Sequence, residues 1–186
     1  MKKALLIASV LFIAVVSTAC INNIAVQELN NKAAEYMQKG DYESAMNRLQ
    51  ASIDLDASMY ETHYNLGIAA LNAKKYDKAI EAFENGIKIK PDYTNFYYSL
   101  GAAQSSYADE LSEEVSAEAA DSESEAIEDE TSKTEDNDIK AIELKQSAIS
   151  NFTKYLEMNP DADDKETVEE LIEDCNPYIK EKSVKE

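Results

Sequence analysis

Apolar and small residues recur every three or four positions through most of the chain, which is the spacing that places them on one face of an α-helix. The pattern is clearest in residues 60–93, where one amphipathic stretch ends at a pair of lysines and a second stretch follows. Pro91 comes directly after the second stretch, and a proline cannot donate a hydrogen bond within a helix. Residues 60–93 therefore predict two helices joined by a short turn.

The two-helix pattern repeats with a period of 34 residues. A weaker copy covers 26–59, and the first helix of a third copy begins at residue 94, within a unit that spans 94–160. The second helix of this third copy resumes only after an inserted segment, 108–142. The copies share small residues where two helices would cross, large apolar residues between the helices, and closing prolines: Ala33, Ala45, Leu66, Gly67, Ala79, Phe83, Pro91, Leu100, Gly101, Ala148, Phe152 and Pro160.

These positions resemble the pattern of the tetratricopeptide repeat (TPR). The resemblance implies an all-α fold, a short right-handed solenoid of three helix-turn-helix repeats. Because no single repeat buries both of its faces, the last one needs a cap with a polar outer face. Residues 161–186 are expected to form this capping helix and a tail, with Val168, Leu171 and Ile172 as its apolar stripe. His63 stands where the repeat has tryptophan, and Ala57 replaces the proline that closes the first copy.

The first nineteen residues have the features of an export signal. Two lysines precede an apolar run from Ala4 to Val16, which is shorter than the roughly 20 residues that a membrane span needs. The run ends in Ser-Thr-Ala before Cys20, which resembles a bacterial lipoprotein signal peptide (1–19). The resemblance implies a lipid on Cys20, a short tether over 20–25, and a place on a membrane of the cell envelope. The outer membrane is favoured because Ile21, and no aspartate, follows the cysteine. Ordinary cleavage after Ala19 is the alternative.

Charge is distributed unevenly along the chain, whose net charge is -19. The insertion 108–142 holds fourteen acidic and two basic residues, whereas residues 1–107 are close to neutral. The chain lacks the clustered lysine and arginine that binding to nucleic acid or to anionic lipid requires. The composition of the insertion predicts a mostly disordered segment whose ends extend the flanking helices. We interpret it as a solvated spacer, with an acidic ligand for a basic partner as the alternative.

The sequence contains no motif that predicts catalysis or metal binding. The nucleophile elbow, the Walker loop, HExxH and CxxC are all absent, and the aspartates in 161–164 lack the glycine and spacing of a calcium loop. His63 is expected to pack at the core or its edge, and Cys175 to be a half-buried free thiol. We therefore expect no enzymatic activity, no metal, and no cofactor apart from the covalent lipid on Cys20.

The TPR resemblance implies a concave groove lined by the first helix of each repeat. The candidate protein-binding residues are amides, hydroxyls, tyrosines and one aliphatic residue: Asn30, Asn31, Tyr64, Asn65, Ile68, Asn72, Asn95, Tyr98 and Ser99. One TPR subclass clamps a terminal carboxylate with lysine, arginine and asparagine. Only Asn65 matches that clamp, so a ligand that ends in a carboxylate is not expected.

Tyr64 and Tyr98 would anchor a ligand, since tyrosine combines a large apolar ring with a polar tip. Alternatively, either ring could pack on a neighbouring helix. The partner expected is another envelope protein or a peptide segment, and the function expected is that of a membrane-anchored scaffold or adaptor. A peptide- or solute-binding protein that serves a transport system is the alternative. The sequence leaves the oligomeric state open.

Overall fold

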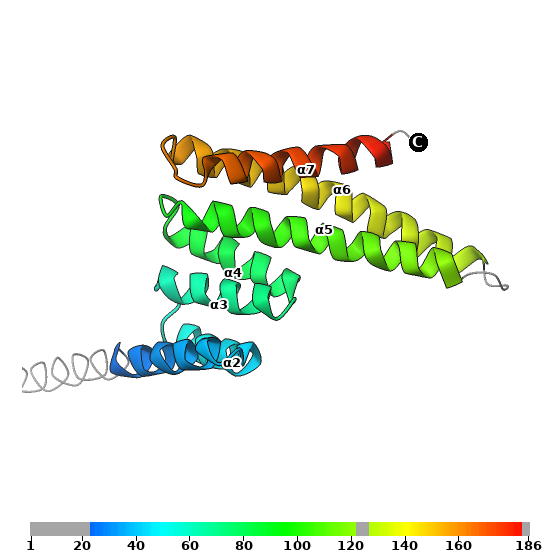
Figure 1. Ribbon diagram of the computed structural model, residues 1–186. Helices are drawn as coiled ribbons and strands as arrows, with labels where there is room; N and C mark the ends of the chain where they lie inside the picture. Colours follow the sequence, from blue (N-terminus) through cyan, green and yellow to red (C-terminus); the bar gives the residue numbers. More distant parts are fainter. Residues whose placement is uncertain (1–22, 122–126, 184–186) are drawn as a thin grey trace, which may run out of the picture.

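A computed structural model of the chain describes the backbone of residues 23–121 and 127–183, and the side chains of 23–113 and 136–176. These residues form seven helices and no strand. A first helix over 23–38 is followed by α2 (Tyr42–Leu55), α3 (Tyr60–Asn72), α4 (Tyr76–Ile89), α5 (Asn95–Asp121), α6 (Ile127–Met158) and α7 (Lys165–Ser183). The helices stack as antiparallel pairs in chain order (Figure 1). The expected arrangement of three helix pairs and a capping helix is confirmed.

Close helix crossings explain the small residues of the repeat. Ala33, Ala45, Ala79 and Ala148 are at most 1% exposed. A Cβ atom added to Gly67 would overlap the ring of Phe83, and one added to Gly101 would lie 2.9 Å from the ring of Phe152. Both phenylalanine rings are fully buried, and Leu100 is buried beside them, so each pair packs a large ring against a residue without a side chain. Pro91 and Pro160 follow the ends of α4 and α6, as expected.

The first two repeats turn between their helices with the same backbone geometry. Gly40 and Lys74, which are 34 residues apart, both have a positive φ, of 73° and 56°. In each turn the next amide donates back over the helix end, Asp41 N to Tyr36 O and Lys75 N to Ala70 O. This pattern is the usual end of a helix at a left-handed residue.

The first helix begins earlier than the sequence indicated. The backbone is already helical at residues 23–25, which we expected to belong to a short tether. Val26 is 1% exposed, so the helix is packed from its first turns onward. Residues 1–22, including the expected signal peptide and Cys20, lie outside the described residues. Within the described part, no helix combines the length and apolar character needed to cross a membrane.

As expected, α5 and α6 extend into the acidic insertion from both sides, and the helices reach further than a mostly disordered segment would allow, to Asp121 and from Ile127. They extend past the turn that joins α3 to α4 and form a long antiparallel hairpin (Figure 1). Its base holds a small apolar core of its own, made by Ala108, Leu111 and Ala141, with Tyr107 and Leu144 packed against it. Acidic side chains at this base, such as Asp109 and Asp136, do not oppose this packing because they are exposed.

A buried lysine joins the hairpin to the rest of repeat three. The Lys145 side chain is 6% exposed, and its Nζ lies 2.6 Å from Asp109 Oδ1. The same atom donates to Ser105 Oγ at 2.9 Å. The buried charge is therefore paired and hydrogen-bonded, as a buried charge must be.

The cap completes this region. Val168 and Cys175 of α7 are buried with Ala148 and Phe152, and Leu171 and Ile172 pack against them as expected. The Cys175 thiol is free, and its Sγ lies 3.8 Å from Ser105 Oγ. Burial raises the pKa of this thiol, so the thiolate is disfavoured and the group is poorly suited to react.

Candidate protein-binding face

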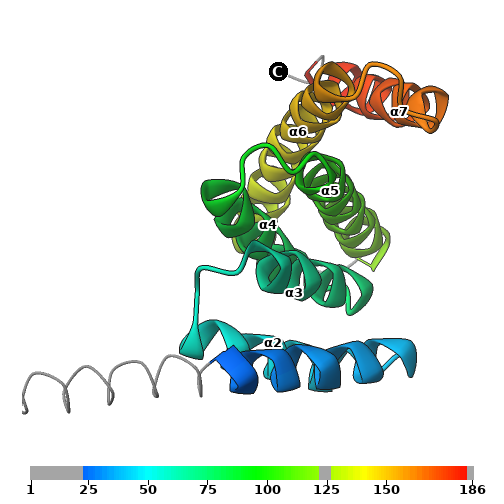
Figure 2. The same ribbon diagram turned by 90° about the vertical axis from the view of Figure 1, so that its left-hand side faces the viewer.

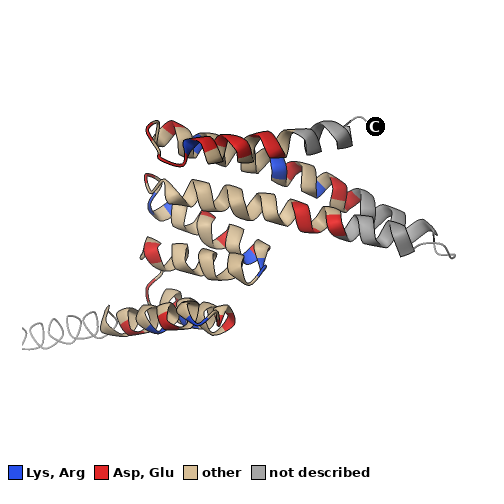
Figure 3. Cartoon of the chain, viewed as in Figure 1, with Lys and Arg blue, Asp and Glu red and all other residues tan. Residues whose placement is uncertain are grey.

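The first helices of repeats two and three present an almost uncharged surface. Within α3 the only charged residue is Glu61, and α5 carries none before Asp109. Figure 3 shows α3 in tan after its first turn and α5 in tan up to the base of the hairpin, where acidic residues begin. A ligand of this face would therefore be held by hydrogen bonds and apolar contacts.

Some of the expected groove residues are exposed. Asn31, Asn72 and Asn95 are exposed on three successive first helices, while Asn65 and Ile68 are partly buried. Asn72 Nδ2 donates to Ile68 O at 2.8 Å, and Asn95 Nδ2 donates to the hydroxyl of Tyr93 at 3.3 Å. Each of these carboxamides still presents polar atoms to the outside, so this part of the expected groove is available to a ligand.

Asn30, unlike these exposed asparagines, is hydrogen-bonded between helices. Its Nδ2 donates to Val26 O at 2.9 Å and to Ser52 Oγ at 2.8 Å, and its Oδ1 accepts from Thr62 Oγ1 at 3.2 Å. Ser52 and Thr62 are fully buried. Asn30 therefore connects the first helix to α2 and α3, and we reassign it from ligand binding to the packing of the first repeat junction.

Tyr64 is part of an aromatic cluster between α3 and α5. Its ring centroid lies 5.9 Å from that of Phe83, 5.5 Å from Phe96 and 5.4 Å from Tyr93. Its hydroxyl accepts from Ser99 Oγ at 3.4 Å, and Ser99 is 4% exposed. The ring thus packs on the neighbouring helix, which is the alternative that the sequence left open, and Ser99 lies beneath the surface.

Tyr98 behaves in the same way one repeat later. Its ring lies 5.9 Å from Phe152 and 5.5 Å from Tyr155, in the cluster beneath the cap. The Tyr155 hydroxyl donates to Asp164 Oδ1 at 2.8 Å. Burial, followed by the neighbouring Asp164 carboxylate, raises the pKa of Tyr155 to about 12. Tyr64 and Tyr98 therefore lie in separate clusters and do not form one aromatic pair.

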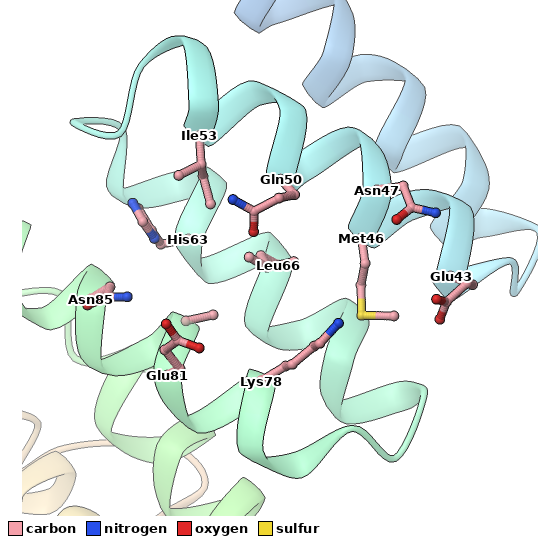
Figure 4. A pocket seen from close by; sticks show the side chains of 11 residues that line it. Glu43, Met46, Asn47, Gln50, Ile53, His63, Leu66, Lys78, Glu81 and Asn85 are labelled. Atoms are coloured by element: carbon pink, nitrogen blue, oxygen red, sulfur yellow. The ribbon is translucent and has the colours of Figure 1, made fainter.

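The sequence did not lead us to a pocket that lies on the second-helix side of the molecule. This pocket has a volume of about 230 Å³ and is formed by α2, α3 and α4 (Figure 4). Met46, Ile53, Leu66 and His63 are among the residues that line it. No single residue signals this pocket in the sequence, because its lining comes from three helices that only the fold brings together.

The described residues provide no evident catalytic centre. Among them, no three histidine, cysteine, aspartate or glutamate side chains are placed so that they could hold a metal ion. His63 is 6% exposed, and its Nε2 lies 3.0 Å from Ala57 O, so this nitrogen must carry the proton and donate it to the carbonyl. A single histidine with a structural hydrogen bond supports the interpretation that it packs at the edge of the core.

Comparison with protein families identifies TPR repeats in part of the chain. A family model described as "Tetratricopeptide repeat" matches residues 60–93, and a second, described as "TPR repeat", matches residues 33–74. Small glutamine-rich tetratricopeptide repeat-containing protein 2 of Mycosarcoma maydis is 28% identical over 75 residues, which are 40% of this chain and 21% of that protein. A TPR repeat-containing protein of Schizosaccharomyces pombe is 34% identical over 80 residues, 43% of this chain and 10% of that one. The chain thus spans about a fifth or less of these relatives.

Solved structures confirm the fold. The second TPR domain of human RPAP3, determined in complex with the HSP70 peptide SGPTIEEVD, matches with a TM-score of 0.59 and 14% identity. The match covers 83% of this chain and 98% of that domain. Residues 33–93 therefore carry TPR repeats, and the described part of the chain has the all-helical fold of a TPR domain.

Proposed function

We propose that this TPR protein is a scaffold or adaptor of the bacterial cell envelope, held at a membrane by a lipid on Cys20, which binds a segment of another envelope protein. The observation that carries the binding role is the presence of exposed carboxamides on each of the three first helices, Asn31, Asn72 and Asn95. Carboxamides both donate and accept hydrogen bonds, so they suit the backbone of a peptide segment.

The lack of charge on this face limits the kinds of ligand that it can bind. The HSP70 peptide bound by the RPAP3 domain contains two glutamates and ends in aspartate. The first-helix face of repeats two and three carries no lysine or arginine that could bind such a peptide, since Asn95 to Ala108 contains no charged residue. We propose that the ligand is a neutral peptide segment and that its terminal carboxylate is not recognised.

The proposed anchor rests on the sequence before the first helix. A basic start, an apolar run and Cys20 follow one another within twenty residues. Two or more acyl chains would make attachment stable, whereas a single chain gives only marginal binding. Because the first helix is already present at residue 23, the TPR domain would lie close to the membrane surface.

A crosslinking experiment tests the binding face. A photoreactive residue replaces Asn72, which is exposed on α3, and the matched control carries it at Glu170, which is exposed on α7. We expect Asn72 to capture one envelope protein repeatedly and Glu170 to capture none of it. Equal capture at both positions would refute the assignment of the first-helix face.

The anchor is tested separately by Cys20→Ala. We expect the variant to lose incorporation of a labelled fatty acid and to leave the membrane fraction, while its helix content in circular dichroism stays unchanged. Retention of the label in the variant would contradict lipidation at Cys20 and would leave the result at Asn72 unaffected.

A further inference from the structure

The second-helix pocket lies between α2 and α4, with α3 as its floor (Figure 4). It is on the opposite side of α3 from the exposed carboxamides, because its walls are the second helices of repeats one and two. The pocket is lined by Glu43, Met46, Asn47, Gln50, Ile53, His63, Leu66, Lys78, Glu81, Ala82 and Asn85.

His63 is part of the lining. His63 and Tyr97 occupy equivalent positions one period apart, and each ring reaches the carbonyl oxygen six residues earlier. His63 Nε2 lies 3.0 Å from Ala57 O, and the Tyr97 hydroxyl donates to Pro91 O at 3.0 Å. Tyr97 also lines a hollow, together with residues of α6. The two junctions therefore differ in the ring that lines the hollow and in the side chains around it.

Part of the lining is apolar. Met46 is 5% exposed, and Ile53 and Leu66 are partly buried. Figure 4 shows these side chains around one hollow, with the Met46 thioether at one end and Ile53 near the other. An aliphatic side chain placed there would remove apolar surface from water on several sides, which is the usual source of affinity in a small pocket.

The rim offers hydrogen bonds. Asn47 and Gln50 come from α2 and Asn85 from α4, so carboxamides stand on both walls. Gln50 Nε2 donates to Asp54 at 3.0 Å, and Asn85 Oδ1 accepts from Lys88 at 3.0 Å. Among the described residues, Gln50 Oε1 and Asn85 Nδ2 have no such bond, so one acceptor and one donor remain for a peptide backbone.

The charges around the pocket cancel. Glu43 forms an ion pair with Lys75, which lies outside the pocket. Lys78 and Glu81 then contribute one charge of each sign. In contrast to the acidic insertion, this pocket favours neither a cationic nor an anionic ligand. It complements an uncharged one.

We propose that the second-helix pocket is a second binding site, which takes an uncharged, extended segment of a partner protein through one aliphatic side chain. The side chain lies on Met46 and Leu66, and the carboxamides of the two walls bond to the backbone on either side of it. This site is independent of the first-helix face, so the chain can bind two segments at once.

Methyl NMR on the full chain in detergent micelles tests the proposal. The methionine methyl groups are labelled with ¹³C, and the probe is a blocked peptide, Ser-Gly-Leu-Gly-Ser, added up to millimolar concentration. We expect the Met46 signal to move in a saturable way, and the Met37 signal, from the first helix, to stay in place. Peptides with lysine, glutamate or alanine in place of leucine should bind at least tenfold more weakly.

Variants separate the pocket from other sites. His63→Tyr places a larger ring in the lining of the pocket and should weaken binding of the peptide at least tenfold, while the reciprocal Tyr97→His, at the next junction, should not change the response of Met46. If His63→Tyr fails to fold, Asn47→Ala combined with Asn85→Ala removes two rim carboxamides without touching the core, and the same loss is expected. Movement of Met37 in place of Met46, equal binding of the charged peptides, or no response in either signal would overturn the proposal.

Discussion

Repeats two and three begin alike and end their first helices differently. In repeat two, α3 stops at Asn72, Lys74 takes a left-handed conformation, and α4 starts at Tyr76. In repeat three the equivalent residue, Ala108, is helical and fully buried, and α5 continues to Asp121. The comparison shows that the residues after the crossing decide where a TPR helix stops. The two-lysine turn closes the helix, whereas a sequence rich in alanine, glutamate and serine allows it to continue.

The extension is stabilised by contacts that repeat two lacks. Tyr107 stacks on Tyr76, its hydroxyl donates to Asp77 Oδ2 at 3.1 Å, and Lys140 Nζ donates to that hydroxyl at 2.7 Å. These groups fasten the base of the hairpin to the side of repeat two. The turn of one repeat thus provides the support for the longer helices of the next.

The largest effect that distinguishes the two repeats is expected at their crossing glycines. The methyl group of Gly67→Ala would overlap ring atoms of Phe83, whereas a Cβ at residue 101 would lie 2.9 Å from the nearest ring atom of Phe152. We expect Gly67→Ala to lower the free energy of unfolding by about 3 kcal/mol, since overpacking a core forces the backbone to move. Gly101→Ala should cost at least about 1 kcal/mol less. Urea unfolding followed by circular dichroism measures both, and equal losses would contradict the comparison.

The hairpin is expected to depend on Asp109 more than on Asp77. Asp109→Ala removes the carboxylate beside the Lys145 ammonium, whose side chain is 6% exposed, and should destabilise the domain by about 2 kcal/mol. Asp77 is exposed and lies 3.9 Å from Lys140, so Asp77→Ala should cost less than about 0.5 kcal/mol. Hydrogen exchange of α5 and α6 amides provides the measurement. A loss of protection confined to the Asp77 variant would show that the buried lysine is not what holds the base together.

Lys74→Gly tests the turn of repeat two. A non-glycine residue with a φ of 56° is strained by its Cβ, so glycine should raise stability by about 1 kcal/mol. Gly40→Ala, at the same place in repeat one, should lower stability by a similar amount. Melting temperatures of the two variants check the opposite signs. A lower melting temperature for Lys74→Gly would mean that the lysine side chain contributes more than its backbone strain removes.

The smallest effect is expected in alkali, from Tyr155 of repeat three, which replaces Gly86 of repeat two. Because the folded state raises the pKa of Tyr155 to about 12, it binds the phenolic proton more tightly than the unfolded chain does. This contribution to stability is complete below pH 10 and is lost as the pH rises from 10 through about 12. Tyr155→Phe should therefore lose stability less steeply in that range. The measurement is the free energy of unfolding of the wild type and the variant between pH 9 and 12.5. If both fall equally with pH, Tyr155 is excluded as a source of the pH dependence.

The fold could be predicted from the sequence because its determinants are local and periodic. Gly67, Ala79 and Phe83 recur at fixed spacing, and each meets its partner in the same or the next repeat. The hairpin could not be predicted in full, because its apolar base joins Ala108 and Leu111 to Ala141 across the insertion. Composition alone describes 108–142 as too acidic to pack, whereas only a few buried residues are needed when two helices lie side by side.

The surroundings of the candidate groove residues were predicted in part for a related reason. Helical position correctly placed Asn31, Asn72 and Asn95 on the outside of the first helices. Position alone could not show that Asn30 would hydrogen-bond to Ser52 and Thr62, or that the ring of Tyr64 would contact Phe96 of α5. Such contacts depend on how closely successive repeats approach, and that distance is a property of the assembled stack.

The Ser105 hydroxyl, which contacts both Lys145 and Cys175, has a consequence for how the molecule opens. In a repeat stack each unit is normally supported only by its neighbours, so ends fray one unit at a time. Here α5, α6 and α7 meet at one buried point, and all three should lose protection together in a single cooperative step. Asn30 links the helix over 23–38 to α2 and α3 in the same way at the other end of the stack. Each end of the stack should therefore open as a group of three helices.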